Sequence, residues 1–391
     1  MPATTFRIAI IGAGPGGLLC ARILQRHGVP VTVYERDLGP VGSTPAGLLE
    51  LRAAGGRAAL RAAGLENEFR AAARPAGLEA RLLDCSGTVL HCDAPEPGTT
   101  EERPEIDRRA LRRLLVDSLA PGTIRWGRYL RTLHPRGGGR HQAVFDDGDT
   151  ATFDLVVGAD GSWSRVRPRL SDATPHYSGV TFVETGLDDV DACHPDVARL
   201  VGHGTMLALS GGKGLIARRD AGGRVRVHAA FRGAEDWART AGVSATDTEA
   251  VRAVLLAAFD GWHDRLLALL RDSDGRFVNR PLYALPVPHT WPHTPGLTLL
   301  GDAAHLMTPL SGRGADLALQ DGCELARQLA EAHTWQIDPD HAVRAYETAL
   351  FPRSTAAAEA AARDLDAALA PDAPRPTHRL FRRRHLHPHR P

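Results

Sequence analysis

The stretch 8–36, IAIIGAGPGGLLCARILQRHGVPVTVYER, decides the fold. It opens with a β-branched run that predicts a buried strand, passes through a glycine-rich loop, and shows helical spacing over 18–27. A second short apolar run, 31–34, follows that helix, and Glu35 stands at its end. Strand, glycine loop, helix, strand and acid in this order indicate a dinucleotide-binding βαβ unit.

Three glycines of this loop, Gly12, Gly14 and Gly17, match the pattern GxGxxG. One permits the tight turn, one lets main-chain amides approach a pyrophosphate at the helix N-terminus, and one allows close packing of helix on strand. Glu35, about 20 residues later, is placed to accept both hydroxyls of an adenine ribose.

Two later apolar runs end in the same way. The run 153–157 leads into GADGSWSRVR, which contains Asp160, and the run 297–300 leads into Gly301 and Asp302. In an open parallel sheet the carboxyl ends of the strands form the ligand-binding edge, so the three motifs are expected to meet there. PLSGRG, 309–314, then brings the backbone close to a flat ligand before a helix starts.

The remaining pattern predicts short helices and strands around this framework. We expect a mainly antiparallel sheet over 180–231 because strands follow one another there without long helices. The other expected elements are a helix at 53–64, a hairpin from 79–83 and 88–91, a loop at 93–104, a helix at 105–119 capped by Asp107, strands within 124–145, a hairpin turn at 146–149, two helices within 249–271, a strand at 276–285, and helices from 314, at 338–350 and at 354–369, with Pro352 as a break or kink.

Composition excludes several classes of function. The chain has 391 residues, a net charge of only +1, and 43% hydrophobic residues, so neither general nucleic-acid binding nor attraction to an anionic membrane is indicated. Lys213, the only lysine, lies in a Gly-rich turn and is expected on the surface, outside any P-loop or Schiff-base context.

Five cysteines without a CxxC pair indicate neither a disulfide framework nor a zinc site, and no metal is expected. No signal peptide or membrane span is visible, and a cytoplasmic protein is expected. From Arg375 onward six arginines and four histidines occur without an acid. Such a tail is typical of a disordered, solvated segment, with nucleic-acid, membrane or adventitious metal contact as alternatives.

Three segments in combination resemble one known family: the strand-linked GAGPGG, the internal DLVVGADGSWSRVR and the late LLGDAAHLMTPLSGRGADLALQDG. Together they look like the group A FAD-dependent monooxygenases of the aromatic-hydroxylase type. Within that family the chain is most similar to the compact tetracycline-inactivating monooxygenases of the Tet(X) kind, notably across EIDRRALRRLL and the third segment.

The resemblance implies a two-domain α/β (α+β) fold, in which a Rossmann-like FAD-binding domain with a mostly parallel sheet is interleaved with an antiparallel-sheet substrate domain. The FAD-binding domain would comprise 1–75, 100–175 and 290–350, the substrate domain 76–99 and 176–289, a C-terminal bridging helix 351–370, and a basic, disordered tail 371–391.

The resemblance also implies cofactor contacts and a substrate region. The residues expected at FAD are Gly12, Ala13, Gly14, Gly17, Glu35, Arg36, Arg108, Leu130, Asp160, Gly301, Asp302, Pro309, Gly312, Gly314 and Ala315. Those expected at the substrate are Glu184, Thr205, Ile216, Arg226, His228 and Leu310, which depart from the tetracycline-inactivating enzymes. From the residues alone, the alternating polar face of 224–231 fits a substrate pocket or a solvent-exposed face equally.

The implied reaction uses FAD, NADPH or NADH as reductant, and O2 as co-substrate. One oxygen atom is transferred through a C4a-hydroperoxyflavin into a polycyclic aromatic or polyketide-type small molecule, in antibiotic tailoring or inactivation. Because the cofactor carries the chemistry, no catalytic side chain is required, and His228 is only a candidate base.

Several alternatives stay open at this point. Hydroxylation, epoxidation and Baeyer–Villiger insertion are not separated, and a flavin-dependent reductase or a non-catalytic flavoprotein on the same fold are rival functions. A monomer or a homodimer is expected.

Overall fold

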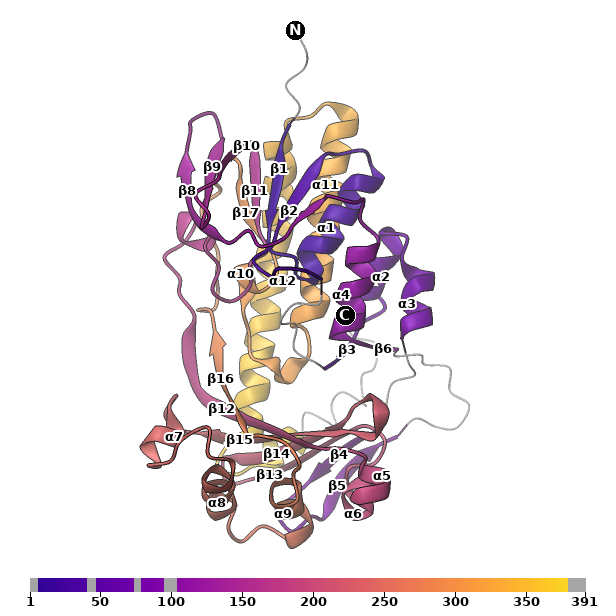
Figure 1. The fold of residues 1–391 in the computed structure, drawn as a ribbon, viewed down its shortest axis with the longest axis vertical. Coiled ribbons are helices and arrows are strands. Elements are labelled where there is room, and N and C mark those ends of the chain that lie inside the picture. The colour runs from indigo at the N-terminus through magenta and orange to yellow at the C-terminus, as the bar shows by residue number, and fades with distance from the viewer. Residues whose placement is uncertain (1–5, 41–46, 74–78, 95–103, 379–391) are drawn as a thin grey trace. The chain divides into compact units, whose positions relative to one another are not determined.

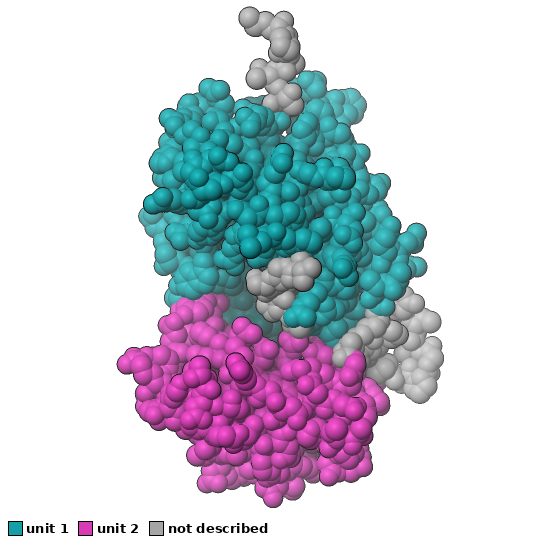
Figure 2. All heavy atoms as spheres, viewed as in Figure 1, with its two compact units in different colours: residues 1–74, 103–176, 284–361 teal, residues 75–102, 177–283, 362–391 magenta. Residues whose placement is uncertain are grey.

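The computed structural model describes residues 6–40, 47–73, 79–94 and 104–378. The chain divides into two compact units, shown in different colours in Figure 2. Unit 1 comprises 1–74, 103–176 and 284–361, and unit 2 comprises 75–102, 177–283 and 362–391. Each unit is therefore assembled from segments that are far apart in the sequence.

Unit 1 contains a parallel sheet, two smaller sheets and most of the long helices (Figure 1). Its strands are β1 (Ile8–Ile11), β2 (Val31–Tyr34), β3 (Leu48–Glu50), β6 (Glu105–Asp107), β7 (Ile124–Arg125), β8 (Leu130–Pro135), β9 (His141–Phe145), β10 (Thr150–Phe153), β11 (Leu155–Gly158) and β17 (Leu297–Leu299). Its helices are α1 (Pro15–Arg26), α2 (Gly56–Ala62), α3 (Glu66–Ala72), α4 (Arg108–Asp117), η1 (Arg167–Arg169), α10 (Asp302–His305), η3 (Pro309–Ser311), α11 (Gly314–Trp335) and α12 (Pro339–Ala368), the last of which ends in unit 2.

The parallel sheet has the strand order β17-β11-β1-β2-β7. Every residue of β1, β11 and β17 is buried, as expected for parallel strands covered on both faces. The helices α1 and α11 pack against each other at glycines. A Cβ atom on Gly16 would overlap the carbonyl oxygen of Ala318, and a Cβ atom on Gly322 would overlap the carbonyl oxygen of Gly16. Small residues thus bring the two helices that carry motifs into direct backbone contact.

Unit 2 contains a seven-stranded sheet of order β16-β12-β15-β14-β13-β4-β5. Its strands are β4 (Ala80–Leu83), β5 (Val89–Asp93), β12 (His176–Leu187), β13 (Thr205–Ser210), β14 (Lys213–Arg219), β15 (Val225–Arg232) and β16 (Val278–Ala284), and its helices are α5 (Val190–Cys193), α6 (Pro195–Val201), η2 (Ala221–Gly223), α7 (Trp237–Thr240), α8 (Thr248–Ala258) and α9 (Asp264–Arg271). One face of the sheet packs against these helices around Met206, Leu215, Val227, Leu255 and Phe259.

The expected fold class is confirmed: a parallel-sheet unit is interleaved with a mainly antiparallel one. The hairpin of β4 and β5 and the two-piece helix α8–α9 are also confirmed. The parallel pairing of β13 with β4 is a local exception within the second sheet.

The expected helix at 105–119 is wrong at its beginning. Glu105–Asp107 forms strand β6, which pairs antiparallel with β3, and Ile106 is fully buried there. The helix starts at Arg108, and the Asp107 carboxylate caps it by accepting from the N–H groups of Arg109 and Ala110, as predicted. Tertiary pairing therefore overrides the helical pattern for one turn.

Of the two outcomes expected at Pro352, a break or a kink, the break is wrong, since α12 runs through this proline as one helix. Proline in a helix interior costs about 3 kcal/mol. Apolar side chains are buried on both sides of it, including Tyr346, Leu350, Ala357 and Ala361, so packing offsets the lost hydrogen bond.

Two further expectations need correction. Residues 371–378, assigned to a disordered tail, fold back on the end of α12, where Thr377 donates to the carbonyl of Ala367; the rest of the tail and most of the loop 93–104 lie outside the described residues. Lys213 is half-buried: its Nζ donates to the carbonyl of Ala258 at the end of α8 and lies 5.9 Å from the ring centroid of Phe259.

Candidate active site

The carboxyl ends of four strands meet at one edge of the parallel sheet. The N–H of Gly12 donates to the carbonyl of Tyr34 (2.8 Å), the N–H of Ala159 to that of Ile11 (2.8 Å), and the N–H of Leu300 to that of Gly158 (2.9 Å). These contacts place the loops after β1, β2, β11 and β17 side by side. The convergence of the three sequence motifs at this edge is therefore confirmed.

The glycines of the first motif differ in what surrounds them. Gly12 has φ +108°, and a Cβ atom there would overlap the carbonyl oxygen of Ala159. Gly17 packs tightly against Gly12 and Ile10. A Cβ on Gly14, in contrast, would meet nothing closer than that carbonyl oxygen at 3.8 Å, so the protein itself leaves open space at Gly14.

Helix α1 begins at this open space without a side-chain cap. Gly14 is the N-cap residue and Pro15 the first helical residue. The free N–H groups of the first turn, together with the helix dipole, form a site that favours an anion.

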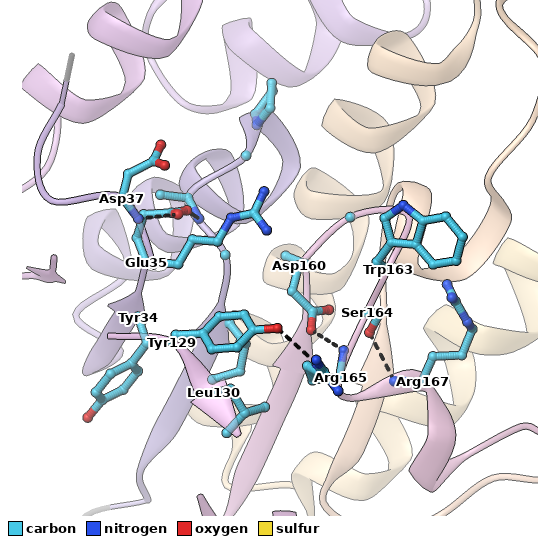
Figure 3. A pocket seen from close by; sticks show the side chains of 18 of the residues that line it. Tyr34, Glu35, Asp37, Tyr129, Leu130, Asp160, Trp163, Ser164, Arg165 and Arg167 are labelled. Atoms are coloured by element: carbon cyan, nitrogen blue, oxygen red, sulfur yellow. Dashed lines mark hydrogen bonds between the residues drawn. The ribbon is translucent and has the colours of Figure 1, made fainter. Parts of the chain in front are cut away.

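Glu35 closes the loop from the side of β2. Its Oε2 accepts from the N–H of Ala13 (2.6 Å) and its Oε1 from the N–H of Asp37 (2.9 Å), and the residue is only 8% exposed. Both carboxylate oxygens thus already hold backbone groups, which fixes the side chain at the rim of the loop (Figure 3).

A cavity of about 740 Å³ opens along these loops. Eight of the residues expected at the cofactor line it, namely Gly12, Ala13, Gly14, Glu35, Arg36, Arg108, Leu130 and Asp160. Its size lies in the range of small-molecule and cofactor sites.

Asp160 lines the cavity between the Tyr129–Leu130 segment and the loop that carries Trp163 (Figure 3). Its Oδ2 accepts from the N–H of Arg165 (2.7 Å), while Oδ1 is buried without a hydrogen-bond partner among the described residues. Burial raises the pKa of Asp160, against hydrogen bonds from Ser164 and Arg165 that favour the carboxylate. An unpaired buried acceptor in a cavity is costly unless a ligand donates to it.

The third motif lies at the end of β17 but does not line this cavity. Gly301 has φ +60°, Asp302 is exposed, and a Cβ on Gly314 would lie 3.9 Å from Oδ1 of Asp302. Pro309 begins the short helix η3, Gly312 has φ +65°, and Gly314 and Ala315 begin α11, whose N-cap Arg313 provides no side-chain cap. Asp302 therefore lies beside a second uncapped helix start.

The sequence reasoning missed several cavity residues. Arg112 lies one turn after Arg108 on α4, and its NH2 donates to Oδ2 of Asp37 (2.8 Å). Tyr129 receives a hydrogen bond from Nε of Arg165 (3.0 Å). The spacing of Arg112 from Arg108 was a usable signal, because residues four apart share a helix face.

In unit 2, five of the six residues expected at the substrate lie on one face of the sheet. Glu184 of β12, His228 of β15 and Ile216 of β14 form one cross-strand row. Arg226 and Thr205 belong to the next row, where both Arg226 and Thr205 pair with Arg218. Leu310 belongs instead to η3 of unit 1.

Charged groups surround Glu184 on this face. Its Oε2 lies 3.7 Å from Nε2 of His228 and 3.3 Å from Nε of Arg280, and its Oε1 lies 4.0 Å from NH1 of Arg226. Contact with His228, followed by the positive charges of Arg280 and Arg226, lowers the pKa of Glu184 to about 2 although burial opposes this. Arg226 also donates to Asp220 (2.8 Å). The face is thus a polar, charged surface.

Among the described residues, no three His, Cys, Asp or Glu side chains gather as a metal site would require. Within the same residues, every helix is too short or too polar to cross a membrane.

Comparison with known proteins agrees with this geometry. Residues 5–263 and 291–361 match the family described as "FAD binding domain". The monooxygenase asqM of Emericella nidulans is 32% identical, over 92% of this chain and 95% of its own length, and the monooxygenase penA of Penicillium thymicola is 33% identical, over 89% and 92%.

Solved structures of the same fold include Klebsiella pneumoniae HpxO complexed with FAD and uric acid (TM-score 0.77, 21% identity, covering 97% of this chain and 92% of that one) and the tetracycline destructase Tet(55) (TM-score 0.72, 20% identity, 98% and 95%). The expected resemblance to flavin monooxygenases, with the tetracycline-inactivating enzymes among them, is confirmed. The chain belongs to the FAD-binding domain family and is an FAD-dependent monooxygenase that uses NAD(P)H and O2.

Proposed function

We propose that the cavity of unit 1 and the adjoining third motif bind FAD, and that the polar face of the unit 2 sheet binds a polycyclic aromatic or polyketide-type small molecule, into which one oxygen atom of O2 is inserted. The observation that carries the proposal is the meeting of an uncapped helix start, the buried carboxylate of Glu35 and an unpaired buried aspartate oxygen along one cavity.

Each FAD contact follows from a local property. The free N–H groups at Gly14 receive the pyrophosphate, with Gly12 and Gly17 keeping the loop and α1 close to β1. Glu35, Arg36 and the backbone of Leu130 hold the adenosine end, and Arg108 supplies a positive charge from α4.

The second and third motifs complete the proposed cofactor site. Asp160 braces the loop after β11 and offers its unpaired Oδ1 to a donor. Asp302, exposed beside the start of α11, accepts from a cofactor hydroxyl, and the segment from Pro309 to Ala315 lies along the isoalloxazine ring with Leu310 beside it. Bound FAD supplies the chemistry, since it takes electrons from NADPH or NADH and makes O2 reactive toward the substrate.

The charges of unit 2 support the proposed substrate class. Arg226, Arg280 and Arg218 outnumber Glu184 and Asp220 on and beside this face. A slight excess of positive charge favours a substrate with acidic phenol or enol oxygens. His228, oriented by Glu184, is the group placed to take a phenolic proton, and Thr205 and Ile216 provide neutral contact area.

The substrate class is tested by measuring NAD(P)H oxidation with a panel of fused-ring aromatic compounds, tetracyclines and purines included, under ¹⁸O2. A ligand that accelerates oxidation and gains one ¹⁸O atom supports the proposal and identifies the class. NAD(P)H consumption that yields only hydrogen peroxide with every ligand favours a flavin reductase instead, and ligand binding without stimulated oxidation favours a binding protein.

The substrate face is tested with His228→Ala and Glu184→Gln, and with His203→Gln as a control at an exposed position of the same unit. We expect the first two variants to weaken substrate binding and to alter the pH profile of turnover while FAD content stays at the wild-type level. Unchanged substrate affinity and pH profile in His228→Ala would show that this face does not bind the substrate.

A further inference from the structure

A buried carboxylate lies directly behind the turn of Gly301 and Asp302. Asp321 of α11 is fully buried, and its Oδ2 accepts from the N–H of Gly301 (3.0 Å) and from Nε2 of His305 (2.6 Å), while its Oδ1 accepts from NH2 of Arg353 on α12 (3.0 Å). An ionised carboxylate is costly to bury unless it is paired and hydrogen-bonded. This one is held by three donors, of which Gly301 and His305 lie at the two ends of α10 and Arg353 lies on α12.

The contact with Gly301 connects Asp321 to the proposed cofactor site. Gly301 has φ +60° and ψ −143°, a conformation that residues with a Cβ rarely adopt. It is the single residue between Leu300 and Asp302, so the position of its N–H determines how the chain leaves β17 and where the Asp302 carboxylate points. Asp321 thereby acts on Asp302 through one peptide unit.

His305 keeps Asp321 charged from the other side. It ends α10 and is 3% exposed, and its Nδ1 has no partner among the described residues. Burial lowers the pKa of His305, but the carboxylate of Asp321, helped by that of Asp302, more than compensates and raises it. Burial likewise raises the pKa of Asp321, and His305 and Arg353 more than reverse this. The raised pKa of His305 and the lowered pKa of Asp321 are both those expected of a charged ion pair between the two side chains.

Other groups near this pair come from each neighbouring segment. Glu324 of α11 contacts NH1 of Arg353 (2.5 Å), and the buried hydroxyl of Tyr346 on α12 donates to the carbonyl of Leu299. His289 lies across a small cavity from His305 and is bound to the carbonyl of Ala304 and to Ser171. Its pKa is lowered by burial, so its charge does not compete with that of His305.

We propose that Asp321 is a positioning residue for FAD, which holds the turn at Gly301 and thus the Asp302 carboxylate in the orientation that the cofactor requires, with His305 and Arg353 as its counter-charges. The proposal rests on the assignment of Asp302 to FAD made above. Asp321 contacts no reacting atom, and its effect passes through the backbone (Figure 1 shows α10, α11 and α12).

A pH dependence follows from the geometry. Because the folded protein raises the pKa of His305, the contribution of the ion pair is complete below the ordinary histidine value and is lost as pH rises through the raised one. We expect FAD affinity to decrease over that rise, since loss of the imidazolium leaves Asp321 less well compensated.

The main experiment measures the FAD dissociation constant of the full chain by fluorescence titration from about pH 6 to pH 9, together with the flavin absorption spectrum and the melting temperature. Asp321→Asn keeps one oxygen to accept from Gly301 but removes the charge. We expect its FAD dissociation constant to rise at least about tenfold, the value for loss of a charged hydrogen bond. Its pH dependence should become flat.

Glu347→Gln is the matched control. Glu347 is a carboxylate of α12 that is also buried, but it accepts from Trp291, Thr298 and His293 and makes no contact with Gly301 or His305 in the described residues. The Glu347→Gln variant should have a lower melting temperature than the wild type, with the same FAD affinity and the same pH dependence of that affinity. Equal melting losses in both variants with unchanged FAD affinity in Asp321→Asn would overturn the proposal.

Two further variants keep the result unambiguous. If Asp321→Asn does not fold, His305→Gln, which retains a donor to Asp321 without a titratable charge, must abolish the pH dependence of FAD binding, and an unchanged dependence refutes the proposal. Asp302→Asn tests the underlying assignment separately. If it weakens FAD binding while Asp321→Asn does not, the positioning role alone is wrong; if Asp302→Asn has no effect, the cofactor assignment of Asp302 is wrong.

Discussion

The N–H of Ala13 donates to Oε2 of Glu35 over 2.6 Å, so the loop after β1 is tied directly to the end of β2. In dinucleotide-binding folds, a carboxylate at this position is ordinarily assigned only to the ribose of the cofactor. Here the same side chain also shapes the glycine-rich loop, because its other oxygen holds the N–H of Asp37. The proposed ribose contact and the geometry of the loop therefore depend on the same residue.

Replacing Glu35 should weaken FAD binding more than loss of a single ribose contact would. Glu35→Ala leaves the N–H groups of Ala13 and Asp37 without their acceptor, and we expect the FAD dissociation constant to rise more than about tenfold, with a lower melting temperature. Fluorescence titration and thermal melting measure both effects. Glu331→Ala, at an exposed position of α11, serves as the control, and wild-type FAD affinity in Glu35→Ala would contradict the assignment.

Two glycines at the start of α1 should respond differently to replacement by alanine. In Gly16→Ala the new methyl overlaps the backbone of α11, and we expect a loss of about 1–3 kcal/mol in the free energy of unfolding. In Gly14→Ala the methyl meets no protein atom closer than 3.8 Å, so stability should be retained while FAD affinity falls.

Urea denaturation and FAD titration of both variants give the comparison. Wild-type FAD affinity in Gly14→Ala would place the pyrophosphate elsewhere.

Acid should remove a contribution that Glu184 makes to stability. Its pKa lies near 2, below the ordinary value of 4.5, so the contribution is present above 4.5 and is lost as pH falls toward 2. Glu184→Gln lacks it at every pH, and the stability difference from the wild type should therefore shrink as pH falls through this window. Urea unfolding at decreasing pH measures this, with Glu249→Gln, an exposed partner of Arg252, as control. A difference that stays constant with pH would refute the charged role.

Glu347 should be required for the stability of unit 1 but not for its cofactor. It is 3% exposed and accepts from Trp291 (2.9 Å), Thr298 (2.9 Å) and His293 (2.7 Å). Glu347→Ala leaves these donors buried and unpaired, and we expect a loss of about 3–5 kcal/mol in the free energy of unfolding. Denaturant titration of the FAD-loaded protein checks this value, and a loss below about 1 kcal/mol would show that water replaces the carboxylate.

The strand-end motifs were predictable because they combine local signals. A short β-branched run predicts a buried strand, and a glycine or aspartate after it marks where that strand stops, so the positions of Gly12, Asp160 and Asp302 followed without knowledge of the tertiary fold. A ligand site was accordingly expected at the edge of the sheet where the cavity lies.

The buried polar pairs were not predictable in the same way. In the sequence, Asp321 looks like an ordinary polar residue of a helix. In the structure it is fully buried, because its partners His305 and Arg353 are supplied by other segments. The strand Glu105–Asp107 and the unbroken helix at Pro352 likewise depend on partners distant in sequence. Single-sequence patterns carry no information on such pairings.

The arrangement of unit 1 also imposes an order on synthesis. Strand β17 pairs with β11, but the whole segment 177–283 of unit 2 lies between them in the chain. As the chain leaves the ribosome, the fully buried strand β11 therefore remains an open, apolar edge until residue 299 has emerged, a state prone to wrong pairing and to chaperone capture. If FAD is held by the third motif as well as the first, as proposed above, then by mass action it stabilises only chains that contain both motifs.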